Sequence, residues 1–233
     1  MEGIVCSVPG GLSSTLGAAA LQWSVGDEGQ WLEVERGWEA SLALLIAERD
    51  ASSLQLLIDD VLLLRGSVLS DGELDVLWRV ISAGSLHVPE AWGRGQGWLD
   101  AVLTGAVTLV AGPGADAGTW SVRRCAQARG SAHASAHGNR AIRRHRLLTG
   151  EVLNLVGGLE DPLDEVVPLA VVRSVLVRMA QAVCSELAFR FLLRCHLLLS
   201  APLSRGTYQR ARRVSQGFGH CVGVVESMRL IVV

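Results

Sequence analysis

The stretch SDGELDVLWRVI, residues 70–81, carries the clearest local structural signal in the chain. Ser70 stands three residues before Glu73, and apolar side chains follow at the spacing of one helical face. A serine at an N-cap and a glutamate three residues later satisfy each other's backbone N–H groups, which is the capping-box pattern. The stretch therefore predicts an amphipathic helix near residues 72–82.

Helical periodicity extends on both sides of this stretch. Residues 37–48 and 53–64 space their leucines for one helical face, and residues 169–199 form a long apolar block that follows Pro168 and predicts one regular helix. Residues 101–111, AVLTGAVTLVA, fit a short buried strand or a helix equally well, because periodicity does not separate the two in so short a run. We expect a mainly α-helical protein with a loosely specified, partly disordered architecture.

Charged residues in the expected helices have structural interpretations. Glu186, Arg190 and Arg194 stand at i, i+4 and i+8, the order that favours a salt-bridge ladder on a helix surface. The adjacent Cys195 is expected in the core. An acidic group could pair carboxylates for acid–base chemistry, but helix ends and solvated faces explain it more simply. Its members are Asp59, Asp60, Asp71, Glu73 and Asp75.

The amino-acid composition is strongly biased. The chain has 233 residues, 49% of them hydrophobic, 19% charged and a mean hydropathy of +0.33, so it can bury a core. All 21 basic residues other than histidine are arginine, lysine is absent, and there are only two asparagines against 26 glycines. Because lysine and arginine both suit solvated surfaces, this bias originates at the nucleotide level. Two origins fit: a gene in a GC-rich genome, or a spurious reading frame never selected to encode protein, such as one antisense to a gene.

The absence of lysine excludes several function classes. A P-loop NTPase needs the Walker A lysine on the phosphates, and a protein kinase needs its strand lysine. Acyl transfer by an S-x-x-K arrangement and Schiff-base chemistry, including that of pyridoxal phosphate, need a lysine amine as well. The chain has no G-x-S-x-G, H-E-x-x-H or C-x-x-C motif either. We expect no cofactor, and the sequence favours a non-enzymatic protein.

Charge divides the chain into three regions. Residues 1–116 carry 16 acidic residues against five arginines and hold six of the seven tryptophans, and the seventh, Trp120, follows directly after. Residues 117–150 form a linker rich in arginine, histidine, glycine and serine, with seven arginines and no acidic residue. Residues 151–233 are aliphatic, expected to be helical, with nine arginines and seven acidic residues. Attraction between the linker and the acidic region is the simplest consequence.

The linker is the candidate functional segment. An acid-free run of this density can contact several phosphates, which predicts non-specific, salt-dependent binding to a polyanion such as nucleic acid or an acidic membrane surface. A solvated linker without a partner is the alternative, because Trp120 is the only aromatic residue near the arginine run that could stack on bases. The candidate polyanion-binding residues are Arg123, Arg124, Arg129, Arg140, Arg143, Arg144 and Arg146.

Two further constellations are weaker. His133 and His137 stand at i, i+4 downstream of Cys125, but glycine and serine surround them and arginines repel a dication, so we expect no metal site. Gly112–Gly118 follows an apolar run as a phosphate-binding loop would. This makes a nucleotide-binding enzyme the weaker functional alternative, since a Gly/Pro turn explains the glycines as well.

The sequence gives no segment that clearly spans a membrane. Residues 3–26 are uncharged, but glycine and serine dilute them and Glu2 stands where a signal peptide has a positive charge. Five arginines and glutamates interrupt the apolar residues 169–203 at regular intervals. Residues 3–26 and 169–203 remain compatible with contact at the surface of a membrane. Five cysteines without the spacing of a disulfide framework favour a reducing intracellular compartment.

Overall fold

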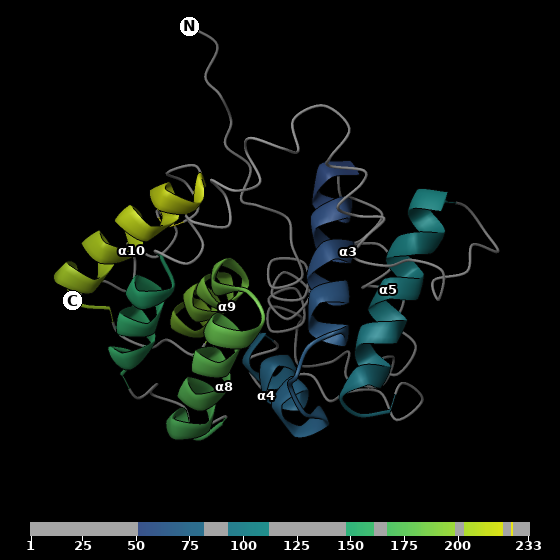
Figure 1. The fold of residues 1–233 in the computed structure, drawn as a ribbon, viewed down its shortest axis with the longest axis horizontal. Coiled ribbons are helices and arrows are strands. Elements are labelled where there is room, and N and C mark those ends of the chain that lie inside the picture. Colours follow the sequence, from purple (N-terminus) through teal and green to yellow (C-terminus); the bar gives the residue numbers. More distant parts are fainter. Residues whose placement is uncertain are drawn as a thin grey trace, which may run out of the picture.

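The fold consists of helices packed against one another, as Figure 1 shows. The computed structural model describes residues 51–81, 93–111, 148–160, 167–198, 203–220 and 225. The labelled helices are α3 (Ala51–Arg65), α4 (Asp71–Ile81), α5 (Gln96–Ala111), α8 (Leu169–Ala182), α9 (Ser185–Leu198) and α10 (Arg205–Phe218), and residues 148–157 are helical too. None of the described residues forms a strand, so the prediction of a mainly helical protein is confirmed.

Helix α4 begins with the capping box that its sequence predicts. The backbone N–H of Ser70 donates to Glu73 Oε2 at 2.7 Å, and the backbone N–H of Glu73 donates to Ser70 Oγ at 3.4 Å. Glu73 also accepts two hydrogen bonds of 2.9 Å from Arg178 Nη1, and Arg178 Nη2 donates to the carbonyl of Val68 at 2.8 Å. The cap of α4 is therefore also its attachment to α8.

Helix α5 decides between the two interpretations of residues 101–111, and the strand is wrong. Its buried side chains recur in pairs every four residues, whereas a strand would bury alternate residues. The hydroxyls of Thr104 and Thr108 donate to the carbonyls of Asp100 and Thr104 at 2.8 Å, so both threonines fit the helix. The buried residues are Trp98, Leu99, Val102, Leu103, Ala106 and Val107.

Two acids of α4 hold the start of α5. Asp75 Oδ1 accepts from the N–H of Gly95 at 2.8 Å, and Asp71 Oδ1 accepts from the N–H of Gln96 at 3.3 Å. Gly95 has φ +57, and a Cβ there would collide with Asp71 Oδ1. Glycine is required at this position both by the backbone conformation and by the close approach of Asp71.

The single helix expected over 169–199 is wrong, because the chain breaks after α8. Helix α8 does begin directly after Pro168, as predicted. At the break, Val183 and Cys184 both donate their N–H groups to the carbonyl of Met179, at 3.0 and 2.9 Å, and α9 begins at Ser185. An unbroken helix of this length would extend about 46 Å and leave apolar faces in water. The break instead packs α9 against α8.

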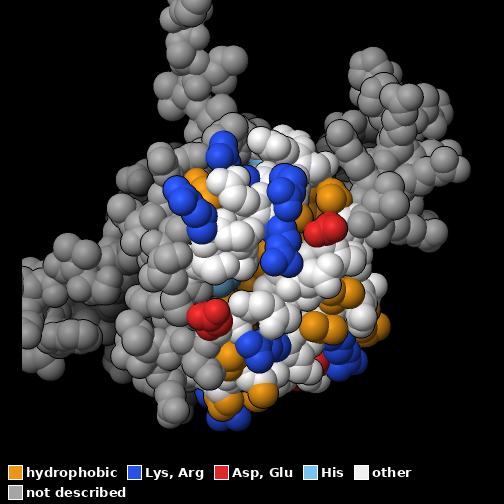
Figure 2. All heavy atoms as spheres, turned by 90° about the vertical axis from the view of Figure 1, so that its left-hand side faces the viewer, with side chains coloured by type: hydrophobic (Ala, Val, Ile, Leu, Met, Phe, Trp, Pro, Cys, Tyr) orange, Lys and Arg blue, Asp and Glu red, His pale blue; other side chains and the backbone are white. Residues whose placement is uncertain are grey.

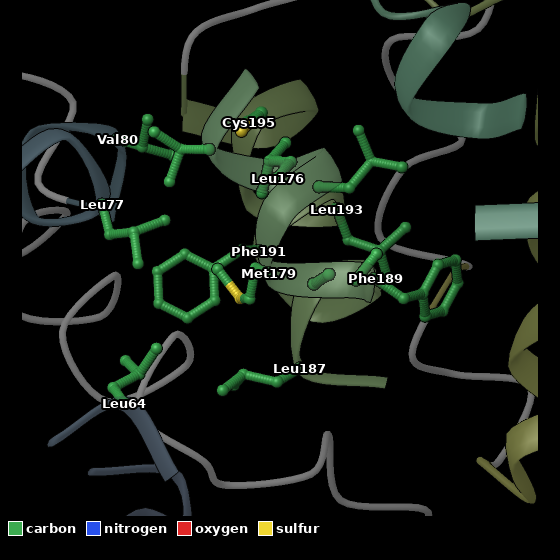
Figure 3. Packing of buried hydrophobic residues seen from close by; sticks show 14 of the residues in the cluster. Leu64, Leu77, Val80, Leu176, Met179, Leu187, Phe189, Phe191, Leu193 and Cys195 are labelled. Carbon is green, nitrogen blue, oxygen red and sulfur yellow. The ribbon is translucent and has the colours of Figure 1, made fainter. Parts of the chain in front are cut away.

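The core contains side chains from helices that precede residues 117–150 in the sequence and from helices that follow them. Helix α4 packs against α8 and α9, and α3 packs along α5 (Figure 1). Side chains of four helices converge in Figure 3, where Leu64 of α3 and Leu77 of α4 face Met179 and Phe191. The three-region division stays a prediction, since most of 117–150 lies outside the described residues.

The remaining expectations concern the N-terminal stretches and membrane-spanning segments. The helix expected over 37–48 and the uncharged residues 3–26 lie outside the described part. Within the described ranges, no helix has both the length and the apolar composition needed to cross a membrane.

Candidate functional site

The predicted site residues of the linker stay untested. The structure describes nothing between residues 112 and 147, so the seven arginines from Arg123 to Arg146 have no described geometry. The same holds for the glycines of 112–118 and for the histidine pair at 133 and 137.

A buried ion pair lies between α3 and α9. Both nitrogens Nη1 and Nη2 of Arg190 donate to the carboxylate oxygens of Asp60 at 2.5 Å. The side chains are only 6% and 1% exposed. The expectation that Arg190 belongs to a surface ladder is thus wrong, and so is the assignment of Asp60 to a helix end or solvated face. Arg190 lies on the buried side of α9, whereas Glu186 and Arg194 of the same helix are partly exposed.

Glu186 extends the ion pair toward α10. Its Oε1 lies 3.9 Å from Arg190 Nε and 3.5 Å from His220 Nε2. The ring of His220 stacks on Phe189 at 6.5 Å with an interplanar angle of 13°, and it also contacts Phe218. The i, i+4 pairing of Glu186 with Arg190 is therefore present, as part of a polar cluster that links α3, α9 and the residues at the end of α10.

The charge state of Arg190 indicates a structural role for this cluster. Burial alone would lower the pKa of Arg190, but the charge and hydrogen bonds of Asp60, helped by Glu186, raise that pKa above its ordinary value. Arg190 is accordingly charged at every physiological pH. Because both side chains are almost fully buried, a substrate in solution does not reach the pair. The pair links α3 to α9, and we assign it no chemistry.

The described thiols are not activated. Cys195 lies in the core, as the sequence predicts, and burial raises its pKa to about 12. Burial also raises the pKa of Cys184 at the α8–α9 break, even though backbone N–H groups of α9 lower it. Both thiols are therefore protonated at neutral pH and poor nucleophiles. Among the described residues, no group of three or more His, Cys, Asp or Glu side chains is placed to hold a metal ion.

Helix α10 presents the most basic described surface. Its arginines Arg205, Arg210 and Arg213 are exposed, and Arg212 lies 6.0 Å from the centre of the Tyr208 ring. No acidic residue occurs in α10. Arginine side chains dominate the charged groups on the side of the molecule that carries α10 (Figure 2). This helix is the candidate functional site in the described part of the chain.

The ends of α10 are well defined. Ser204 Oγ accepts from the N–H of Thr207 at 3.1 Å and forms the N-cap. Gly219, with φ 84, ends the helix in the left-handed conformation, and its N–H donates to the carbonyl of Gln216 at 3.0 Å. The opposite face of α10 buries Tyr208 and Val214 in the core. The arginines are thus held on a fixed scaffold.

Sequence reasoning missed this surface although a signal exists. From residue 187 to residue 225 the chain has six arginines and no acidic residue. Ser204 and Gly219 are residue types that mark the start and the end of a helix, so the sequence also indicates the two ends of α10.

Comparison of the chain with known protein families, curated proteins and solved structures finds no match. No residue role comes to this chain from a relative.

Proposed function

We propose that this chain is a non-enzymatic interaction protein that binds anionic partners through arginine-rich surfaces. The observation that carries the proposal is the exposed, acid-free arginine surface of α10. The linker residues 123–146 supply a second arginine-rich segment in the same chain. Clustered arginines gain affinity for polyanions by releasing the counterions that surround phosphate or sulfate groups.

The described ionisable groups support a binding role over catalysis. The buried carboxylate of Asp60 is bonded to Arg190, and Glu73 is bonded to Ser70 and Arg178. Both described thiols have raised pKa values. Activated nucleophiles and proton donors tend to cluster in clefts with shifted pKa values suited to their chemistry, whereas Asp60 and Glu73 connect helices.

Salt-dependent binding of the full chain tests the proposal. Binding of fluorescein-labelled heparin is measured between 50 and 200 mM NaCl, and we expect the logarithm of the affinity to fall steeply with the logarithm of the salt concentration. One variant replaces five linker arginines by glutamine, namely Arg123, Arg124, Arg143, Arg144 and Arg146. A second replaces Arg205, Arg210 and Arg213. Each set is expected to reduce the salt dependence; no binding by the unmodified chain at 50 mM would overturn the proposal.

The origin of the reading frame needs a separate measurement. A selected protein with the described core is expected to unfold in one cooperative thermal transition and to yield matching peptides from cells. A frame never selected to encode protein predicts neither. A broad, featureless transition together with no peptides would favour the spurious frame and would remove the basis for a binding function.

A further inference from the structure

The exposed face of α10 alternates arginine and glutamine. Arg205, Gln209, Arg213 and Gln216 are all exposed, and they follow at intervals of four, four and three residues. At 100° per residue these side chains form one stripe along the helix. The stripe lies opposite the face that buries Ala211 and Val214.

The residue types of this stripe match the chemistry of base edges. Arginine donates two hydrogen bonds to the O6 and N7 atoms of guanine, and glutamine pairs with the N6 and N7 atoms of adenine. Arg210 and Arg212 lie beside the stripe, on its two sides, where cations would reach phosphate groups. The ring of Tyr208 lies under the guanidinium of Arg212 at 6.0 Å.

The dimensions of α10 also fit a DNA groove. The four side chains of the stripe extend over about 16 Å of helix axis, and an α-helix with its side chains is about 10–12 Å wide. The major groove of B-DNA is about 12 Å wide, which admits one helix. A stripe of this length would face about four or five base pairs at 3.4 Å each.

The charges of α10 do not serve the stability of the helix. Its first turn contains Arg205 and no acidic residue, although the positive end of the helix dipole favours anions there. Arg210 and Arg213 are like charges at i, i+3, which repel each other weakly. No carboxylate of the described residues forms an ion pair with Arg205, Arg210 or Arg213. An external anion would compensate an arrangement that costs the isolated helix stability.

We propose that α10 binds double-stranded DNA by lying in its major groove, with Gln209 and Gln216 toward base edges and the arginines toward phosphates and guanines. This inference rests on the proposed polyanion-binding function and names its partner. Duplex DNA is favoured over an acidic membrane because α10 buries its apolar face in the core and has none to insert. It is favoured over duplex RNA because side chains do not reach into the deep, narrow major groove of RNA.

Three variants of the full chain test the inference by fluorescence anisotropy on a labelled 20-base-pair random-sequence DNA duplex. The first replaces Arg205, Arg210 and Arg213 by glutamine. The matched control makes the same charge change at Arg65, Arg79 and Arg94, which lie on α3, on α4 and just before α5, away from α10 (Figure 1). We expect the α10 variant to bind at least tenfold more weakly and to lower the salt slope by about three. The control should change both quantities far less, with the thermal unfolding of each variant confirming that it folds.

The third variant, Gln209→Ala with Gln216→Ala, tests groove contact rather than charge. Selection from a random duplex pool with the unmodified protein is expected to enrich a motif of four or five base pairs, and this variant should lose that motif while keeping the same salt slope. Equal losses in the α10 and control variants, or tighter binding to anionic phosphatidylserine vesicles than to duplex, would overturn the inference. If heparin binding depended only on the linker arginines, the proposed function would stand and the role of α10 would fall. If heparin and DNA both failed to bind, the proposed function itself would fall.

Discussion

Breaking the Asp60–Arg190 pair is expected to be the most damaging polar substitution in the described part of the chain. Asp60→Asn or Arg190→Met leaves one buried group without its partner, in a site where the side chains are 1% and 6% exposed. Removing one member of a buried pair costs about 3–5 kcal/mol, because the remaining charge is neither solvated nor compensated. Since a domain is stable by only about 5–15 kcal/mol, this is a large share of the total.

The double variant Asp60→Leu with Arg190→Met separates the cost of an unpaired charge from the value of the pair. Apolar side chains of similar size fill the site without a desolvation penalty, and such replacements are often neutral or stabilising. We therefore expect the double variant to recover most of the loss seen in each single variant. The result would be a large coupling free energy in a double-mutant cycle.

Urea unfolding followed by circular dichroism measures these free energies. The exposed pair between Arg65 Nε and Asp100 Oδ1, 2.8 Å apart with side chains 38% and 50% exposed, supplies the matched control. Arg65→Gln is expected to cost less than about 1 kcal/mol. Losses that small for Asp60→Asn and Arg190→Met would show that water reaches the pair, and the argument from burial would be refuted.

Three other predictions concern the helix ends and the core. Partial burial raises the pKa of Glu73, but hydrogen bonds from Ser70 and Arg178 outweigh burial and keep that pKa below its ordinary value. The Glu73 carboxylate therefore stabilises the fold above its unfolded-state pKa, and this contribution is lost as the pH falls through the folded-state pKa. In urea unfolding, Glu73→Gln should cost about 1 kcal/mol at pH 7 and almost nothing at pH 2. An equal cost at both pH values would contradict this prediction. Gly95→Ala should lower the free energy of unfolding by about 1–3 kcal/mol, because the added Cβ meets Asp71 and φ is +57. Gly72→Ala is the control: its Cβ meets nothing within 4 Å, so the variant should be as stable as the unmodified chain or more stable. Similar effects of the two substitutions would argue against the contact with Asp71. The Cys195 thiol should react with iodoacetamide at pH 8 only after unfolding, as followed by mass spectrometry, because burial raises its pKa to about 12; rapid labelling of the folded chain would place it outside the core.

Local signals were sufficient to predict several elements. The capping box located the start of α4, Pro168 located the start of α8, and Cys195 was placed in the core. Each of these conclusions depends on residues within a few positions of one another. Backbone geometry and helix periodicity decide them without knowledge of the rest of the chain.

The wrong predictions all depend on contacts between distant segments. Periodicity places Arg190 one turn after Glu186, but it gives no information about α3, whose Asp60 lies 130 residues earlier and takes the guanidinium into the core. The break at Val183 likewise depends on the space available beside α8, which no local pattern describes. The sequence of residues 101–111 fits a strand and a helix equally well, because burial there also depends on packing against other segments. The burial pattern of α5 shows that this segment is a helix.

The pairing of Asp60 with Arg190 has a consequence for synthesis on the ribosome. Translation proceeds at about 5–20 residues per second, so the partner of Asp60 is made roughly 6–26 seconds after Asp60 itself. During that interval α3 has a carboxylate on the face that will become buried, and the helix has no complete surface against which to pack. A nascent chain stopped before residue 190 would hold α3 exposed to chaperones and proteases. The last third of the chain therefore determines when the first described helix is protected.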